Sequence, residues 1–116
     1  MARYSSLFTV SSPMESFRQR LSDLLRSCDC DVIYDVKDYM VAREVPGHVS
    51  FSSLVTVEVL IDPVIHSDAE VRMNIVVKNE ELPLKQDNHC RRRFNQLYDA
   101  FTSSHDWHLI ESIPAV

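Results

Sequence analysis

Residues 4–28 read YSSLFTVSSPMESFRQRLSDLLRSC and hold a change from a strand pattern to a helix pattern. From Tyr4 to Val10, aromatic and β-branched residues alternate with their neighbours, which predicts a strand. A helix start follows, with Ser12 as the N-cap, Pro13 at the first helical position and Glu15 completing a capping box. We therefore expect a strand followed at once by a helix that begins at Pro13.

The expected helix carries one apolar stripe. Its members recur at spacings of three, four and one residues: Met14, Phe17, Leu21, Leu24, Leu25 and Cys28. The charged residues of the same segment fall mainly on the other side. This amphipathic pattern predicts a helix that covers a sheet and ends near Cys28.

The rest of the chain continues with strand patterns and one more helix. Residues 30–45 alternate on either side of Lys37, which favours a hairpin, although a single long bent strand is also consistent with the pattern. Further strands are expected at 54–62, 70–77 and 107–113, and a helix at 89–102 capped by Asp87 or Asn88. The order β-α-β-β-β-β-α-β predicts one α+β domain over residues 1–116, with an antiparallel sheet and two helices on one face.

Composition excludes several functions. The 116 residues contain a single glycine, where average usage of about 7% would give about eight. Phosphate-binding loops need several glycines, so this chain cannot build one. Gly47 follows Pro46 in an expected type II turn, where a positive φ is required. The net charge of −5 argues against general binding to nucleic acid or to anionic membranes.

Three cysteines, Cys28, Cys30 and Cys90, occur in a chain with no export signal and no long apolar run. An odd number of cysteines in this context indicates reduced thiols in the cytoplasm. A metal site could combine these cysteines with His89, or use His105 and His108. Neither set has the paired cysteine spacing of structural zinc sites, so we expect no metal and no other cofactor.

Cys90 is the candidate nucleophile, because it lies beside His89 in the first turn of the second helix, where the helix dipole favours a thiolate. However, Cys90 is in phase with the apolar residues Phe94, Leu97 and Phe101 of that helix. This phase points its sulfur into the core. We therefore expect a structural cysteine and no enzymatic activity, with catalysis by Cys90 as the alternative.

Arg91, Arg92 and Arg93 place three cations at the positive end of a helix dipole, where acidic residues are preferred. Glu80 and Glu81 in the preceding loop could compensate by pairing with them. Alternatively, the arginines and exposed amides could bind an anion or an acidic protein surface. Glu80 and Glu81 are adjacent in a polar loop, so we do not interpret them as a catalytic pair.

Several segments carry a resemblance to a known group of proteins. They are DYMVAREVPG (38–47), VEVLID (57–62), RMN (72–74), VVKNEELPL (76–84) and DNHCR (87–91). They are spread over about half of the chain, between residues 38 and 91, and resemble small conserved proteins of cyanobacteria that have no assigned activity. The resemblance implies an intracellular protein of a photosynthetic bacterium with an accessory role, and it transfers no functional residue.

These observations favour a non-enzymatic protein-interaction or accessory module. The expected contact surface is Arg91, Arg92 and Arg93 with Glu80 and Glu81, close to the start of the second helix. A protein partner is expected, nucleic acid and membranes are not, and a homodimer through an edge strand or the outer sheet face remains open. The alternatives are a domain that binds a small ligand or anion, and an enzyme that uses Cys90.

Overall fold

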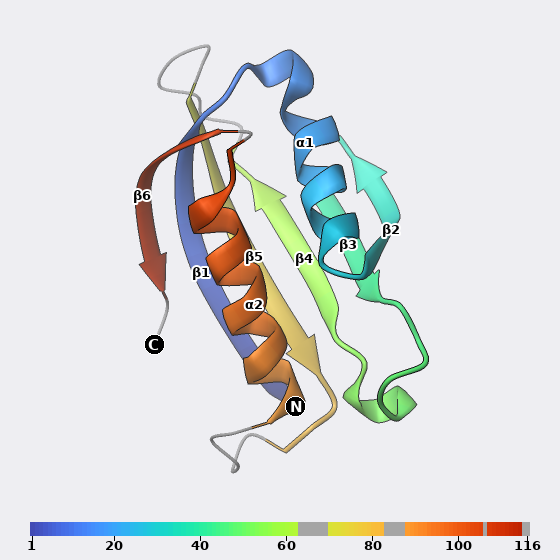
Figure 1. Ribbon diagram of the computed structural model, residues 1–116. Coiled ribbons are helices and arrows are strands. Elements are labelled where there is room, and N and C mark those ends of the chain that lie inside the picture. Colours follow the sequence, from blue (N-terminus) through green and yellow to red (C-terminus); the bar gives the residue numbers. More distant parts are fainter. Residues whose placement is uncertain (63–69, 83–87, 106, 115–116) are drawn as a thin grey trace.

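The computed structural model describes residues 1–62, 70–82, 88–105 and 107–114. These residues form one antiparallel sheet with two helices (Figure 1). In chain order the elements are β1 (Ala2–Ser11), α1 (Met14–Ser27), β2 (Cys30–Val36), β3 (Tyr39–Glu44), a 3-10 helix (Phe51–Ser53), β4 (Thr56–Ile61), β5 (Glu70–Asn79), α2 (His89–Ser103) and β6 (His108–Pro114). The predicted order of strands and helices is confirmed.

The six strands lie in the order β2-β3-β4-β5-β1-β6, and every neighbouring pair is antiparallel. After β1, the chain crosses through α1 to the far edge of the sheet and returns as the meander β2 to β5. The helix α2 then leads to β6 at the other edge. Consequently β1 pairs with two strands that come much later in the sequence.

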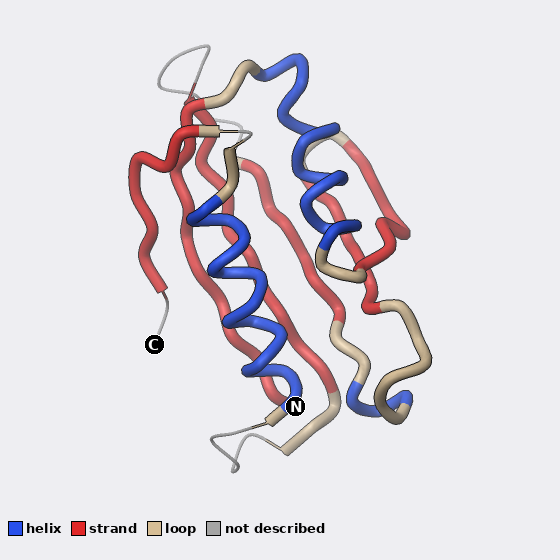
Figure 2. The backbone as a smooth tube through the Cα atoms, viewed as in Figure 1, coloured by secondary structure: helices blue, strands red, loops and turns tan. Residues whose placement is uncertain are grey.

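Both helices cover the same face of the sheet, α1 beside β2 and β3 and α2 beside β1 and β5 (Figures 1 and 2). The core lies between the helices and that face. It includes Phe8, Phe17, Leu21, Leu25, Met40, Val57, Met73, Ile75, Leu97 and Phe101. Alternation along each strand sends every second side chain into this core, as its pleat requires.

The segment 30–45 forms the expected hairpin. β2 and β3 pair antiparallel, with the turn at residues 37 and 38 and a bulge between Val32 and Tyr34. The alternative of one long bent strand is therefore wrong. Gly47 follows Pro46 with φ +128°, and its positive φ agrees with the turn expected there.

The start of α1 differs from the expected capping box. Pro13 occupies the N-cap position, the helix begins at Met14, and the hydroxyl of Ser12 is buried without a hydrogen-bond partner among the described residues. At the other end the prediction holds, because α1 ends at Ser27 with Cys28 as its C-cap. Asp29 then takes φ +60°, a left-handed conformation that is usually given to glycine.

None of the helices in the described part of the chain combines the length and apolar character that crossing a bilayer requires.

Candidate functional site

The five residues of the expected contact surface, together with His89 and Cys90, gather at one end of the molecule, which we call the base, whereas His108 pairs with Ser11 at the opposite end of the sheet. The base consists of Met1 and residues 43–54, 78–82 and 88–93. Figure 1 shows this end at the bottom of the view, where α2 begins, β5 ends and the 3-10 helix lies. Its inner part is a set of buried polar contacts, and its outer part is exposed.

The N-terminus of α2 is capped entirely from within the chain. The carboxylate of Glu81 accepts hydrogen bonds from the amides of His89 (3.2 Å) and Cys90 (2.9 Å). Asn88 is the N-cap, which confirms one of the two predicted alternatives. Its side chain accepts a hydrogen bond from the amide of Arg91 at 2.8 Å. The amide of Arg92 donates to the carbonyl of Asn88 at 3.1 Å. The four amides on which an external anion would depend are already bonded.

Glu81 is held in this capping position by Asn79. The Asn79 side chain donates to the carboxylate at 2.5 Å and accepts from the Glu81 amide at 3.0 Å. Burial alone would raise the pKa of Glu81. The hydrogen bonds from Asn79 and from the Cys90 and His89 amides outweigh this effect, so the pKa lies below its ordinary value. The compensating charge for the helix dipole is therefore Glu81. Asp87, the other predicted cap, lies outside the described residues.

Beneath this cap lies a buried ionic cluster of Glu44, His89 and Arg93. Glu44 is only 4% exposed, and its carboxylate oxygens lie 2.8 and 3.0 Å from His89 Nε2. The same carboxylate accepts from the Val55 amide at 3.1 Å and lies 3.7 Å from Arg93 Nε. Arg93 also donates to the carbonyl of Cys28. The cluster thus joins the end of β3, the start of α2 and the end of α1.

Cys90 does not have the surroundings of a nucleophile. It is fully buried, and its sulfur lies near the carbonyls of Val77 (3.5 Å) and Ala2 (3.8 Å). Burial, with a smaller contribution from the Glu81 charge, raises the pKa of Cys90 to about 12. The neighbouring His89 is engaged with Glu44. These contacts support a structural role for this thiol.

The other two cysteines are also almost inaccessible to solvent. Cys28 and Cys30 are buried, and all three cysteines are free thiols. Burial raises the pKa of Cys30 to about 11 despite the Arg93 guanidinium nearby. Among the described residues, no group of three His, Cys, Asp or Glu side chains could hold a metal ion.

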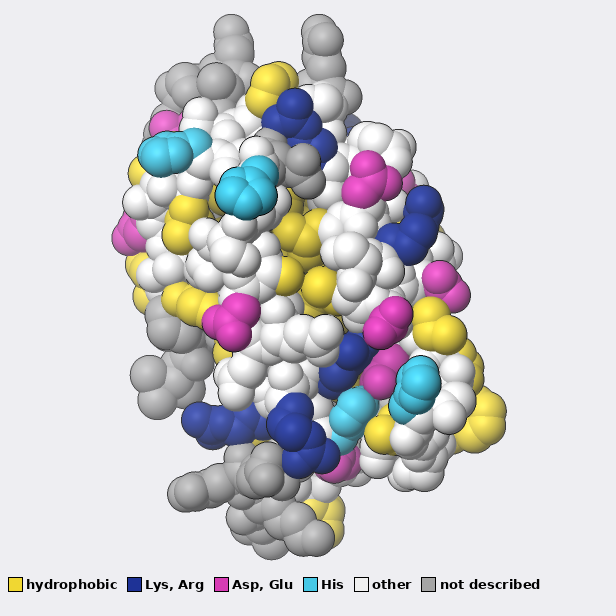
Figure 3. All heavy atoms as spheres, viewed as in Figure 1, with side chains coloured by type: hydrophobic (Ala, Val, Ile, Leu, Met, Phe, Trp, Pro, Cys, Tyr) yellow, Lys and Arg dark blue, Asp and Glu magenta, His cyan; other side chains and the backbone are white. Residues whose placement is uncertain are grey.

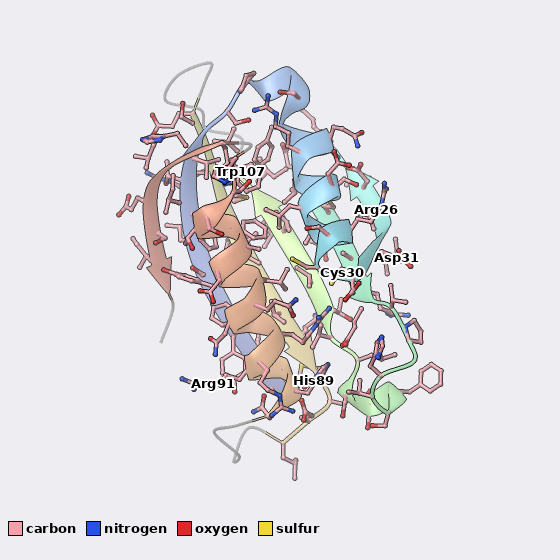
Figure 4. The ribbon with its side chains drawn as sticks, viewed as in Figure 1. Arg26, Cys30, Asp31, His89, Arg91 and Trp107 are labelled. Atoms are coloured by element: carbon pink, nitrogen blue, oxygen red, sulfur yellow. The ribbon has the colours of Figure 1, made fainter. Side chains whose placement is uncertain are left out.

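The structure divides the five predicted contact residues into two sets. Glu81 and Arg93 point inward and serve the cap and the buried cluster. Arg91, Arg92 and Glu80 are exposed on the outer side of the base. Arg91 lies over the ring of Tyr4, 5.9 Å from its centroid, and Figure 4 shows it on the opposite side of α2 from His89. In Figure 3, Lys and Arg side chains gather over this start of α2.

Sequence reasoning missed the apolar part of the base. Phe51 is 84% exposed, and Leu82 and Met1 are also largely exposed. A pocket of about 450 Å³ has Met1, Phe51 and Glu80 in its wall together with the cations Arg43 and Lys78. The available signal was a single aromatic residue among serines in the segment Ser50-Phe51-Ser52-Ser53.

The loop that carries Phe51 is fixed by hydrogen bonds. The Glu80 amide donates to the Ser52 carbonyl at 3.2 Å, and the Asn79 side chain donates to the Ser53 carbonyl at 2.9 Å. Within the 3-10 helix, the Leu54 amide donates to the Phe51 carbonyl at 3.2 Å. Asn79 therefore ties both the Glu81 cap and the Phe51 loop to the end of β5.

Comparison with known proteins identified no matching family model, no similar curated protein and no similar solved structure.

Proposed function

We propose that this protein is a non-enzymatic protein-interaction or accessory module whose contact surface is the outer side of the base. The surface combines Phe51 and Leu82 as apolar contacts with Arg91 and Arg92 as cationic ones. Its partner is a protein surface with an apolar pocket and acidic residues around it. We place this activity in the cytoplasm, where the three free thiols stay reduced.

The exposure of Phe51 is the observation that carries the proposal. A phenyl ring that is 84% exposed gains almost nothing from the chain's own core. The serines around it and the hydrogen bonds to Asn79 and Glu80 keep its backbone in place. An aromatic anchor presented on a fixed backbone loses little conformational entropy when a partner covers it.

The arginines support an acidic partner. Arg91 and Arg92 lie at the positive end of the helix dipole, and the Glu81 carboxylate at the same end offsets the cost of placing cations there. Arginine forks suit carboxylates on a facing protein surface and would accelerate its association. The same internal capping weakens the alternative of an anion-binding domain, and the buried, high-pKa Cys90 weakens the alternative of an enzyme.

The test compares variants of a tagged protein in affinity capture from the native organism. Phe51→Ser and the double variant Arg91→Gln/Arg92→Gln should each lose the same partner. Arg26→Gln is the matched control, because this exposed arginine lies on α1, away from the base (Figure 4). Circular dichroism of each variant checks that the fold is intact. Retention of every captured protein by both base variants would show that the proposed surface is wrong.

A further inference from the structure

The face of the sheet opposite the helices carries an apolar row that crosses every strand. The strand register aligns six residues in this row: Val36, Tyr39, Leu60, Asn74, Leu7 and Ile113. All but Asn74 are apolar or aromatic. Leu60 is 45% exposed, and Val36 and Ile113 are exposed to a similar degree. Within the described residues, no helix covers this face.

The next row adds to the same patch. Tyr34 is half exposed, packs edge-on against Tyr39 with ring centroids 5.8 Å apart, and aligns with Val41. The row continues with Glu58 on β4 and with Val76 on β5, which is only 3% exposed, so its exposed apolar part lies on β2 and β3. Contiguous apolar side chains exposed on one face of a protein commonly mark an interaction site. The exposed row therefore indicates a surface that another protein covers.

Charges at the two ends of this face are opposite in sign. The row at the base end contains Arg3, Lys78 and Arg43, with Asp31 at its edge. The far end carries Glu70, aligned with Ser11 and His108, and also Glu111. Arg72 lies between the apolar row and Glu70. Glu58, one row nearer the apolar row, pairs with Lys78. The base end thus keeps a small excess of positive charge and the far end a small excess of negative charge.

We propose that this sheet face binds a second copy of the chain, about a two-fold axis that runs along the apolar row. Such an axis lays the row of one copy on the row of the other. It also places the cationic end of each copy over the acidic end of its partner. Lys78 and Glu70 lie four residues on either side of Asn74 on β5, so Lys78 of one copy faces Glu70 of the other.

The alternative two-fold, along the strands, would bring cationic end onto cationic end. Face-to-face packing of sheets keeps their strands within about 30° of each other, which the chosen axis allows. Lys78 already pairs with Glu58 in its own chain, and Glu70 of the second copy adds a further carboxylate. Charge complementarity therefore favours a second copy of the chain as the partner, and it favours the two-fold along the apolar row over the two-fold along the strands.

The area of the face fits a stable dimer. Six strands spaced about 4.8 Å apart, with β1 and β5 rising about 3.4 Å per residue over their length, span roughly 24 by 30 Å. The shorter outer strands fill part of this plane, and side-chain relief adds to its accessible area. The result is comparable to the ~800 Å² per partner of a standard protein interface.

Sedimentation velocity between about 5 and 500 µM tests the proposal, since dimerisation depends on concentration. Wild-type protein should form dimers. Leu60→Asp and Ile113→Asp each bury a carboxylate in the apolar row and should weaken dimerisation more than about tenfold. Phe51→Ser, an exposed apolar residue at the base, is the control and should leave the dimer unchanged. A wild-type monomer at every concentration, or dimers that survive both aspartates, would overturn the proposal.

Two charge reversals test the orientation. Glu70→Lys and Lys78→Glu should each weaken self-association roughly three- to tenfold, because each variant places like charges opposite each other. An equal mixture of the two variants restores both pairs across the interface and should dimerise nearly as well as wild type. The intrachain contact between position 78 and Glu58 is not repaired by mixing, so recovery reports the interface alone. Failure of the mixture to recover would rule out this two-fold.

Discussion

Replacement of Glu44 by glutamine tests whether the buried cluster at the base holds the two helices to the sheet. Glutamine keeps the shape of the side chain and an acceptor for the Val55 amide. It removes the negative charge that faces His89 and Arg93. Arg93 then remains mostly buried without its nearest carboxylate.

The expected loss of stability follows from the burial. Removing one partner of a buried ion pair costs about 3–5 kcal/mol, and the hydrogen bonds that glutamine keeps place Glu44→Gln near the lower limit, at about 2–3 kcal/mol. Glu58→Gln is the control, because Glu58 pairs with Lys78 at the surface and should cost about 1 kcal/mol or less.

Urea unfolding followed by circular dichroism measures both variants. With a slope of about 1–3 kcal/mol per M, the loss of about 2–3 kcal/mol for Glu44→Gln should lower the urea midpoint by about 0.7–3 M without changing the slope. Combining it with Arg93→Met should cost about 1–2 kcal/mol less than the sum of the single changes, because the two groups interact. A loss below about 1 kcal/mol for Glu44→Gln, or strict additivity, would refute the reasoning.

Three more predictions concern the same end of the molecule. Because the pKa of Glu81 is lowered in the folded state, its carboxylate stabilises the fold above the ordinary glutamate pKa of about 4.3, and this contribution is lost as the pH falls through the lowered value. Glu81→Gln should therefore reduce stability at neutral pH and flatten the acid limb of the unfolding curve; an unchanged acid limb would contradict the capping role. Cys30 and Cys90, with pKa values of about 11 and 12, should resist a thiol-specific disulfide reagent at pH 8 until urea is added, and rapid labelling of native protein would disprove their burial. Asp29→Gly should raise stability by about 0.5–1 kcal/mol by relieving the left-handed φ, whereas Asp29→Val should lower it.

Local periodicity was sufficient to predict most of the fold. The strand and helix patterns gave the order of elements because each depends on residues within a few positions of one another. The second helix shows this clearly, since Asn88 and the stripe with Leu97 and Phe101 lie where expected. The capping box at Ser12 is wrong because Pro13 keeps an extended ψ of 128° and itself occupies the N-cap position, which leaves Ser12 one residue too early to cap the helix.

The buried cluster could not be predicted in the same way. Glu44 and His89 are 45 residues apart, and only the pairing of β3 within the sheet and the placement of α2 bring them together. One local signal was present. Glu44 has the same strand parity as the buried Met40 and Ala42, and an acid on the apolar side of a strand requires a partner. The signal indicates a missing partner but does not name it.

The two proposed surfaces lie on different parts of the molecule, one at the base and the other on the open face of the sheet. At the base, the proposed contacts are made by exposed side chains that take no part in capping α2. On the sheet face, they are made by the apolar row that no helix covers. A two-fold along that row points the base of one copy away from the base of the other. In such a dimer the two partner-binding surfaces lie at opposite ends, so one dimer can join two partner molecules without crowding them. This geometry favours an accessory protein that connects other proteins over one that forms a site of its own.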